Sequence, residues 1–414
     1  MRIWLVNQYA APPSRGGITR HHTLAHELMR RGHDVTLIAS SFDHVTRTET
    51  SPAMTGTHHD EITDGVPFIW VRTPGYAGNT HARVRNMLAF AWRVWQLKSR
   101  ARTAAPDVIL GSSPHLLAAL AAERLARSFG VPFVLEIRDL WPQSLVDLGA
   151  LSERHPTVMG LRVIERYLYR HAARIVTVLP GVPEYLVARG VPGEKVTWIP
   201  NGVNFELAPE PTPPSGHAPL TVLYAGAHGM ANHLDTAIDA ARVLQLDGGH
   251  AVRFRFVGDG PEKARLQDDA RRSGLQNVEF ADPVPKTLIY DVLSGADALL
   301  VMLKDSPVFQ WGVSPNKLYD YMAAGRPVIF CVRTPTNPVS ENDAGFCVPP
   351  GDPAALADAV RRLSDMSNEE RWSMGRRGRN YVQERHDLRK LSGTLEGVLI
   401  EALSARTVPL PAPS

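Results

Sequence analysis

The segment from Ser314 to Ile329 combines residue types that can bind a ligand carrying both phosphates and hydroxyls. Ser314 and Pro315 predict the start of a helix, because serine can cap a helix and proline is tolerated in its first turn. Lys317 and Asp320 lie three residues apart and therefore share a face near the positive end of that helix. Such a helix suits a sugar nucleotide. The alternative is a well-capped helix in which these two side chains only pair with each other.

Glycines follow three predicted strands where a helix is about to begin. A glycine lets a ligand approach the backbone and meet free N–H groups. The first loop lacks the Gly-x-Gly-x-x-Gly spacing of dinucleotide-binding proteins, which argues against NAD. Each loop alone could be an ordinary turn, but two of them in the C-terminal half, together with the Ser314 helix, favour a nucleotide site. The residues predicted to bind substrate are Gly16, Gly17, Gly226, His228, Gly229, Gly258, Ser314, Asn316 and Asp320.

Two opposite charges, Arg138 and Asp139, stand at the end of the predicted strand 132–138. Charges at that position are rarely needed for packing, which favours a functional role. Asp139 could orient or deprotonate a hydroxyl, and Arg138 could neutralise a phosphate. The alternative is that both side chains pair with neighbouring loops and hold the turn.

Short apolar runs alternate with helical patterns along the chain, which predicts an α/β protein with two doubly wound parallel sheets. Ligands bind beyond the carboxyl ends of such strands. The helix 18–31 is expected to expose Arg20, His21 and His22 on its first turn, with no catalytic role. The predicted strands are 2–8, 34–40, 67–73, 107–112, 132–138, 174–179, 196–199, 220–226, 252–257, 278–280, 298–303 and 327–332. The predicted parts are an N-terminal domain 1–205, a proline-rich linker 206–214, a C-terminal domain 215–385, a C-terminal helix 386–405 and a disordered tail 406–414.

Composition indicates a globular protein of the cytoplasm. The chain has 414 residues, of which 44% are hydrophobic and 21% charged, and it contains no apolar run of the ~18 residues that a membrane span needs. The net charge of +3 is too small to indicate nucleic acid as a partner. The two cysteines, Cys331 and Cys347, lie in apolar runs and are expected to be reduced thiols.

Residues 81–102 contain six lysines and arginines and no acidic residue, interleaved with tryptophan, phenylalanine and leucine. A basic amphipathic helix of this kind can lie on an anionic membrane, so peripheral membrane association is expected here. The alternative is a helix packed on the first sheet with a solvated basic edge. The basic residues are Arg83, Arg85, Arg93, Lys98, Arg100 and Arg102.

Six motifs, spread over nearly the whole chain, occur in the order found in one enzyme family. They are Gly16-Gly17, Arg31-Gly32-His33-Asp34-Val35, Ile199-Pro200-Asn201-Gly202-Val203, Gly258-Asp259-Gly260-Pro261, Asp320-Tyr321-Met322-Ala323-Ala324-Gly325-Arg326-Pro327-Val328 and Val348-Pro349-Pro350-Gly351-Asp352-Pro353. On these motifs the chain resembles the family 4 glycosyltransferases. The segments 314–318 and 138–142 are most similar to the subgroup of N-acetyl-L-fucosamine transferases of bacterial surface-polysaccharide assembly.

The resemblance implies the GT-B fold, in which two Rossmann-like domains face a cleft and the C-terminal helix returns to the N-terminal domain. It implies a retaining hexosyltransferase that moves an N-acetylhexosamine-type sugar from a UDP donor to a glycan or polyprenyl-linked acceptor. The C-terminal domain would hold the nucleotide sugar and the N-terminal domain most of the acceptor. No cofactor and no essential metal are expected, and the enzyme would work in the cytoplasm at the inner face of the cell membrane.

The chain departs from the family pattern at three places. Gly312 stands where many relatives have the first of two glutamates, and Asp320 takes the place of the second. The segment 227–229 lacks the usual arginine and lysine, so Lys317 is expected to face the diphosphate. Arg138 replaces a histidine before Asp139. The expected catalytic residues are Lys317, Asp139 and Arg138. The alternatives are an inactive sugar-nucleotide binding module, transfer to a small-molecule acceptor, and a phosphorylase or epimerase of the same fold.

Overall fold

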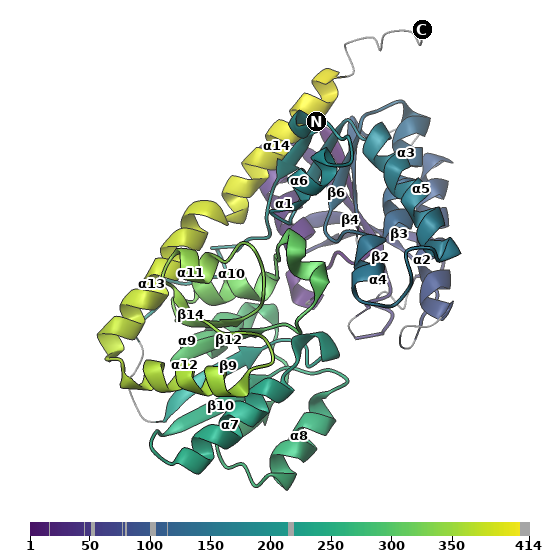
Figure 1. Ribbon diagram of the computed structural model, residues 1–414. Coiled ribbons are helices and arrows are strands. Elements are labelled where there is room, and N and C mark those ends of the chain that lie inside the picture. The colour runs from purple at the N-terminus through teal and green to yellow at the C-terminus, as the bar shows by residue number, and fades with distance from the viewer. Residues whose placement is uncertain are drawn as a thin grey trace. The chain divides into compact units, whose positions relative to one another are not determined.

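The computed structural model describes residues 1–15, 17–44, 46–50, 54–76, 78, 81–99, 105–113, 115–213 and 219–405. Within them the chain forms two compact units (Figure 1). The first unit contains Met1–Pro200 together with the chain from Leu388 onward, and the second contains Asn201–Asp387. The predicted substrate residue Gly16 and the predicted tail 406–414 lie outside the described residues.

The first unit is built on a sheet of order β3-β4-β2-β1-β5-β6-β7-β8, in which only the β3–β4 pair is antiparallel. Its central strands are apolar and buried along almost their whole length, as expected for parallel strands covered on both faces. The elements are β1 Arg2–Val6, α1 Arg20–Arg30, β2 Asp34–Ser40, β3 His58–Thr63, β4 Val66–Val71, α2 His81–Gln96, β5 Val108–Ser112, α3 Leu116–Phe129, β6 Phe133–Ile137, α4 Gln143–Asp147, α5 Pro156–His171, β7 Arg174–Thr177, α6 Val182–Val187, β8 Val196–Trp198 and α14 Leu388–Ser404.

Helices cover both faces of this sheet. On one face α1 and α14 lie side by side, and their leucines join the core formed with β1 and β2 (Figure 1). On the other face α2, α3 and α5 form a layer in which α3 contacts both of its neighbours. The C-terminal helix therefore packs on the N-terminal unit, as the family resemblance implied. Among the residues that the structure describes, none of the helices has the length and apolarity needed to span a bilayer.

The second unit contains a sheet of order β11-β10-β9-β12-β13-β14, with every neighbouring pair parallel. Helices α7, α8 and α12 contribute to the core on one face, and α9, α10 and α11 to the core on the other. The elements are β9 Leu220–Ala225, α7 Asp235–Asp247, β10 Val252–Val257, α8 Lys263–Arg272, β11 Val278–Ala281, α9 Ile289–Ser294, β12 Ala298–Met302, α10 Asn316–Ala323, β13 Val328–Cys331, α11 Pro338–Glu341, β14 Gly345–Cys347, α12 Pro353–Asp365 and α13 Asn368–Arg385.

The predicted fold class is confirmed, but the division between the units lies at Pro200–Asn201 rather than after residue 205. The described part of the predicted linker, 206–213, belongs to the second unit. Two buried arginines hold it there: Arg379 Nη1 donates to the Pro209 carbonyl at 2.9 Å, and Arg326 Nη1 donates to the Thr212 carbonyl at 2.8 Å. A buried guanidinium needs acceptors for its donors, and this proline-rich backbone supplies them.

Candidate functional site

The two glycine loops of the second unit pack against each other at the carboxyl ends of β9 and β10. The φ angles of Gly226, Gly258 and Gly260 are 150°, 143° and 155°, a region that favours glycine. A Cβ atom on Gly258 would lie 2.0 Å from the Gly226 carbonyl oxygen, and one on Gly260 would lie 2.5 Å from the His228 carbonyl oxygen. These glycines are therefore needed first for the contact between the two backbones.

Only some of the loop amides are available to a ligand. The Gly226 N–H donates to Val257 O at 2.9 Å, and the Gly258 N–H donates to Ala281 O at 3.2 Å. By contrast, the N–H groups of Ala227 and Gly229 donate to no other residue in the described part of the chain. One of these two amides thus belongs to Ala227, between the predicted glycines, and the other to Gly229, a predicted substrate residue.

The Lys317 ammonium lies against the first glycine loop. Its Nζ donates to the Tyr224 hydroxyl at 2.6 Å and to Asn232 Oδ1 at 3.1 Å. It lies 4.3 Å from the centroid of the Tyr224 ring, and a Cβ atom on Gly226 would be 3.1 Å from it. All of these partners are neutral, and among the described residues no carboxylate pairs with Lys317. A cation without a counterion at a helix N-terminus can bind an anion.

Burial lowers the pKa of Lys317 to about 7. Part of the side chain still reaches solvent, but its ammonium is enclosed by Tyr224, Asn232 and the backbone at Gly226. An anionic ligand would favour the charged form and raise this pKa again.

Asp320 does not pair with Lys317, although the two share the first turns of α10. Its carboxylate forms a salt bridge with Lys286 and accepts a hydrogen bond from the Tyr290 hydroxyl at 3.0 Å. Burial, with Asp320 as the next cause, raises the pKa of Tyr290 well above its usual value, so this hydroxyl stays a donor. Both oxygens of Asp320 therefore have partners, and a ribose hydroxyl would share them.

The predicted serine cap is wrong. Pro315 occupies the N-cap position of α10, and no side chain caps the helix. Ser314 is instead bonded to Asn201: the Asn201 N–H donates to Ser314 Oγ at 3.2 Å, and Asn201 Nδ2 donates to the Ser314 carbonyl at 2.6 Å. The loop from Asn201 thus orients the start of α10, and Asn316 is exposed at its first position.

His228 is buried, which the sequence did not indicate. Its side chain is 0% exposed and lies among the rings of Tyr224, Phe256 and Phe280. Burial, with Lys263 as the next cause, lowers its pKa to about 4, so the imidazole is neutral at pH 7. In this conformation the ring packs in the core, and His228 offers only its backbone to the loop. Lys317 is the cation here, not His228.

In the first unit, the loop after β6 places Arg138 half-buried and Asp139 exposed. The Arg138 N–H donates to Ser113 Oγ at 3.1 Å, and one of its guanidinium nitrogens is buried with no hydrogen-bond partner in the described part. Gly17, with φ 79°, is exposed at the loop before α1. The structure describes these residues in a different unit from Lys317.

A buried charged cluster behind this loop was missed, because Arg20 and His21 were expected to be exposed. Both are buried, as is His22. Glu136, 2% exposed, accepts hydrogen bonds from Arg20 Nε at 3.2 Å, His21 Nε2 at 2.6 Å and Ser112 Oγ at 2.5 Å. Glu136 inside the predicted strand 132–138 could have indicated this cluster. A glutamate in a buried strand needs hydrogen-bond or ion-pair partners.

Burial alone would raise the pKa of Glu136, but His21 and Arg20 outweigh that effect and hold it well below its usual value. Burial lowers the pKa of His21 despite the contact with Glu136. Arg20 also donates to the backbone carbonyls of Ile199 and Pro200. The cluster therefore joins the start of α1, the end of β6 and the residues Ile199 and Pro200, after which the chain enters the second unit.

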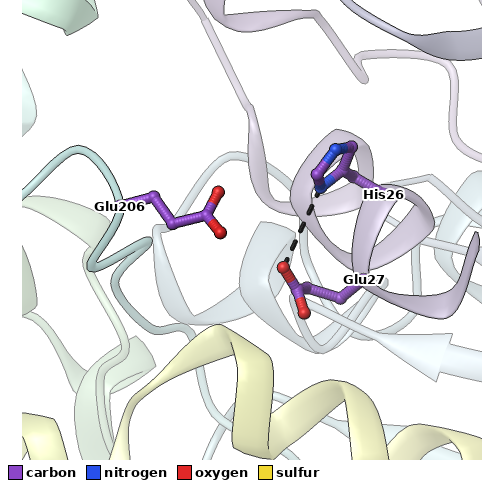
Figure 2. A group of neighbouring side chains, drawn as sticks. All are labelled: His26, Glu27 and Glu206. Atoms are coloured by element: carbon purple, nitrogen blue, oxygen red, sulfur yellow. Dashed lines mark ion pairs between the residues drawn. The ribbon is translucent and has the colours of Figure 1, made fainter. Parts of the chain in front are cut away.

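Further along α1, His26 and Glu27 lie side by side (Figure 2), with 3.9 Å between His26 Nδ1 and Glu27 Oε1. Arg30 Nη1 donates to the same oxygen at 3.2 Å. The carboxylate of Glu27 is thus already engaged within its own helix.

Two family models match this arrangement of two units. Residues 15–202 match the glycosyl transferase 4-like domain, and residues 219–366 match the glycosyl transferases group 1 domain. The chain is a family 4 glycosyltransferase. This glycosyltransferase is 24% identical to WbjE of Pseudomonas aeruginosa, named as a probable glycosyltransferase, over 76% of this chain and 80% of that protein. It is 25% identical to WcaI of Escherichia coli, named for colanic acid biosynthesis, over 72% and 77% of the two chains.

Among solved structures, the glycosyltransferase matches Anabaena HepE in complex with UDP, with a TM-score of 0.69 and 15% identity. The match covers 97% of this chain and 100% of that one. The two structures agree over their whole chains although their sequences differ widely, which shows that the fold is GT-B. The family and the fold implied by the sequence motifs are thereby confirmed.

Gly312, which stands where many relatives of this glycosyltransferase have a glutamate, adopts a backbone conformation that favours glycine. Gly312 has φ 90° and ψ 173° and is buried where it ends a short helical turn. That conformation is essentially restricted to glycine. A glutamate at position 312 would be strained, so any contact to the donor sugar at this point must come from the backbone or from other residues.

Proposed function

We propose that this glycosyltransferase transfers an N-acetylhexosamine-type sugar from UDP to a glycan or polyprenyl-linked acceptor in bacterial surface-polysaccharide biosynthesis. The reaction proceeds with retention of configuration and without an essential metal, in the cytoplasm at the inner face of the membrane. HepE, whose structure contains UDP, and WcaI, named for colanic acid biosynthesis, support this class of donor and product. The sugar type rests on the subgroup resemblance of the segments 314–318 and 138–142.

One observation carries the proposal: the Lys317 ammonium lies beside the first glycine loop with only neutral partners. The N–H groups of Ala227 and Gly229 on that loop are unpaired among the described residues. Two amides, a cation and the N-terminus of α10 can together hold a diphosphate. They can also stabilise the negative charge that develops on it as the bond to the sugar breaks.

In the retaining transfer, the acceptor hydroxyl approaches the anomeric carbon from the side on which the diphosphate leaves. The bond from the anomeric carbon to the phosphate oxygen breaks, and the new glycosidic bond forms at the same carbon. The proton of the acceptor hydroxyl passes to the departing phosphate oxygen. In this scheme Lys317 stabilises the leaving group, while Asp139 and Arg138 in the first unit orient the acceptor.

Binding of UDP is the first test. In a thermal-shift screen at 100 times Kd, UDP should add about 2.7 kcal/mol of stability, whereas GDP, ADP and dTDP should add little. At pH 8, binding of UDP should also be accompanied by proton uptake at Lys317, because this side chain, with a pKa of about 7, is mostly neutral before the anion binds. Calorimetry in two buffers of different ionisation enthalpy measures this uptake.

Lys317→Met is the control, since it keeps the length of the side chain but has no proton to gain. Stabilisation by GDP or dTDP, but not by UDP, would show that the donor assignment is wrong. UDP binding without proton uptake would place the diphosphate away from Lys317. Binding of a UDP sugar with no transfer or hydrolysis of a labelled donor would instead indicate the inactive binding module.

The membrane part of the proposal rests on α2, where the structure modifies the expectation from sequence. Met87, Phe90 and Val94 are buried, yet an exposed stripe of the same helix is apolar as well. Arg93 donates to the Arg72 carbonyl, so part of the basic charge serves the fold. The stripe consists of Val84, Leu88 and Trp92, which are 53%, 52% and 63% exposed and lie four residues apart. Arg100 and Arg102 lie outside the described residues.

Replacing Leu88 and Trp92 with glutamine should weaken binding to lipid vesicles on the order of tenfold, since the two side chains no longer gain from leaving water. Co-sedimentation with vesicles measures the change. Leu246→Gln is the matched control, because Leu246 is 81% exposed on α7 of the second unit. The melting temperature should hardly change in either protein. Equal vesicle binding by the α2 variant and the control would contradict membrane docking through α2.

A further inference from the structure

A second feature of the first unit carries a charge pattern that the transfer reaction does not use. A groove with a volume of about 930 Å³ lies along α5 and the segment 189–195, which follows α6 and leads to β8. Five cationic side chains and two carboxylates line it. The cations are Arg162, Arg166, Arg170, Arg189 and Lys195, and the carboxylates are Glu153 and Glu165.

Both carboxylates are occupied by a single arginine. Arg162 donates to Glu153 and Glu165 at 3.1 Å each, and also contacts Gln143 and the Tyr185 hydroxyl. Glu165 is buried and accepts a further bond from the Tyr169 hydroxyl at 2.9 Å. The remaining four cations thus face the groove without compensation by its carboxylates.

These four cations are of two kinds. Lys195 Nζ donates to the backbone carbonyls of Tyr169 and Arg170, and Arg189 lies 3.5 Å above the Tyr185 ring, so both are held in place. Arg166 and Arg170 are exposed, and among the described residues neither forms an ion pair. Two fixed and two unpaired cations around one groove fit the phosphate group of a ligand, because guanidinium groups match phosphate oxygens.

The exposed face of α5 indicates where that phosphate comes from. Met159 and Val163 are 59% and 67% exposed and lie seven residues before Arg166 and Arg170, respectively. The four positions repeat every three or four residues and so form one stripe, apolar in its first half and basic in its second. A soluble phosphate would leave the apolar half in water. We propose that the groove binds the phosphate headgroup of an anionic membrane lipid, with Met159 and Val163 contacting its acyl chains.

This inference goes beyond the proposed transfer reaction, because it depends on neither the nucleotide nor the sugar. Since α2, α3 and α5 form one layer, the apolar stripe of α2 and the stripe of α5 belong to the same side of the sheet. The two make different contributions. The α2 stripe supplies apolar contact with any bilayer, whereas the α5 groove supplies selectivity for negative charge.

The test compares vesicles of phosphatidylcholine alone with vesicles that also contain phosphatidylglycerol, using the full-length protein. The double substitution Arg166→Gln and Arg170→Gln should weaken binding to the anionic vesicles by about thirtyfold, the factor expected from two basic residues near such a surface. Binding to neutral vesicles should stay unchanged. The matched control is Arg271→Gln with Arg272→Gln on α8, which removes the same charge from the second unit.

A fluorescent label gives the position independently. In a Cys347→Ser background, which removes the exposed native thiol, an environment-sensitive dye on Val163→Cys should shift to the blue with anionic vesicles. The same dye on Ile400→Cys, 48% exposed on α14, should not shift. The inference is overturned if the arginine variant binds anionic vesicles like its control. It is also overturned if these arginines bind inorganic pyrophosphate but make no difference to vesicle binding. If only the α2 variant fails to change vesicle binding, the apolar contact of α2 with the bilayer is contradicted. The comparison of anionic with neutral vesicles still tests the α5 groove.

Discussion

Replacing Lys317 with alanine should lower kcat by about 10² or more while leaving the protein folded. Among the described residues its hydrogen-bond acceptors are the neutral groups of Tyr224 and Asn232, so no counterion competes with the departing diphosphate for the ammonium. A donor of this kind acts mainly as charge develops in the transition state, and removing one typically costs 10²–10³ in turnover. The measurements are kcat and the donor KM with a UDP sugar, together with the melting temperature.

Removing the Lys317 ammonium should lower activity but should not lower the free energy of unfolding. The folded state lowers the pKa of Lys317 to about 7, below that of an unfolded lysine, so the unfolded chain binds more protons between about pH 7 and pH 10. Lys317 therefore favours unfolding as the pH falls through that range, and Lys317→Met should remove this dependence. The proposal would be contradicted if both variants lost melting temperature but kept normal kinetics when folded, because Lys317 would then serve the fold alone.

Replacing Glu136 with leucine should destabilise the first unit by roughly 3–5 kcal/mol, the usual cost of leaving a buried charge unpaired. Arg20, His21 and Ser112 all donate to this carboxylate, and all three are buried. The pKa of Glu136 is held low, so its contribution is complete above the pKa of an unfolded glutamate. It is lost only as the pH falls towards the folded value. Denaturant unfolding followed by circular dichroism measures the change.

Two further variants separate a buried charge network from simple packing. Adding Arg20→Met to Glu136→Leu should restore part of the stability, because no unpaired charge then remains on Arg20. Glu401→Leu breaks an exposed ion pair with Arg174 and should cost less than about 1 kcal/mol. If the double variant is as unstable as the sum of its single substitutions predicts, charge pairing is not what holds this cluster together.

The fold class and the positions of the glycine loops could be predicted from the residue pattern. Most parallel strands of both sheets were predicted, because a strand buried on both faces must be apolar along its length, as in β5 and β6. The edge strand β3 was missed, since its sequence His58–Thr63 is polar and exposed and only its antiparallel partner β4 defines it. The motifs of the family also predicted the GT-B fold correctly, because they mark turns and helix starts that are local in the chain.

Which polar side chains are free to act could not be predicted from the sequence, because their partners come from distant segments. Whether Arg20 is exposed depends on Glu136, which lies far along the chain on another strand. The partners of Lys317 and Asp320 come from β9, from the turn after it and from the region of α9. His228 is buried because three aromatic rings from neighbouring strands enclose it. Helical spacing predicts which residues share a face, but the contacts that neutralise, bury or release a charge are made between distant segments and follow from packing alone.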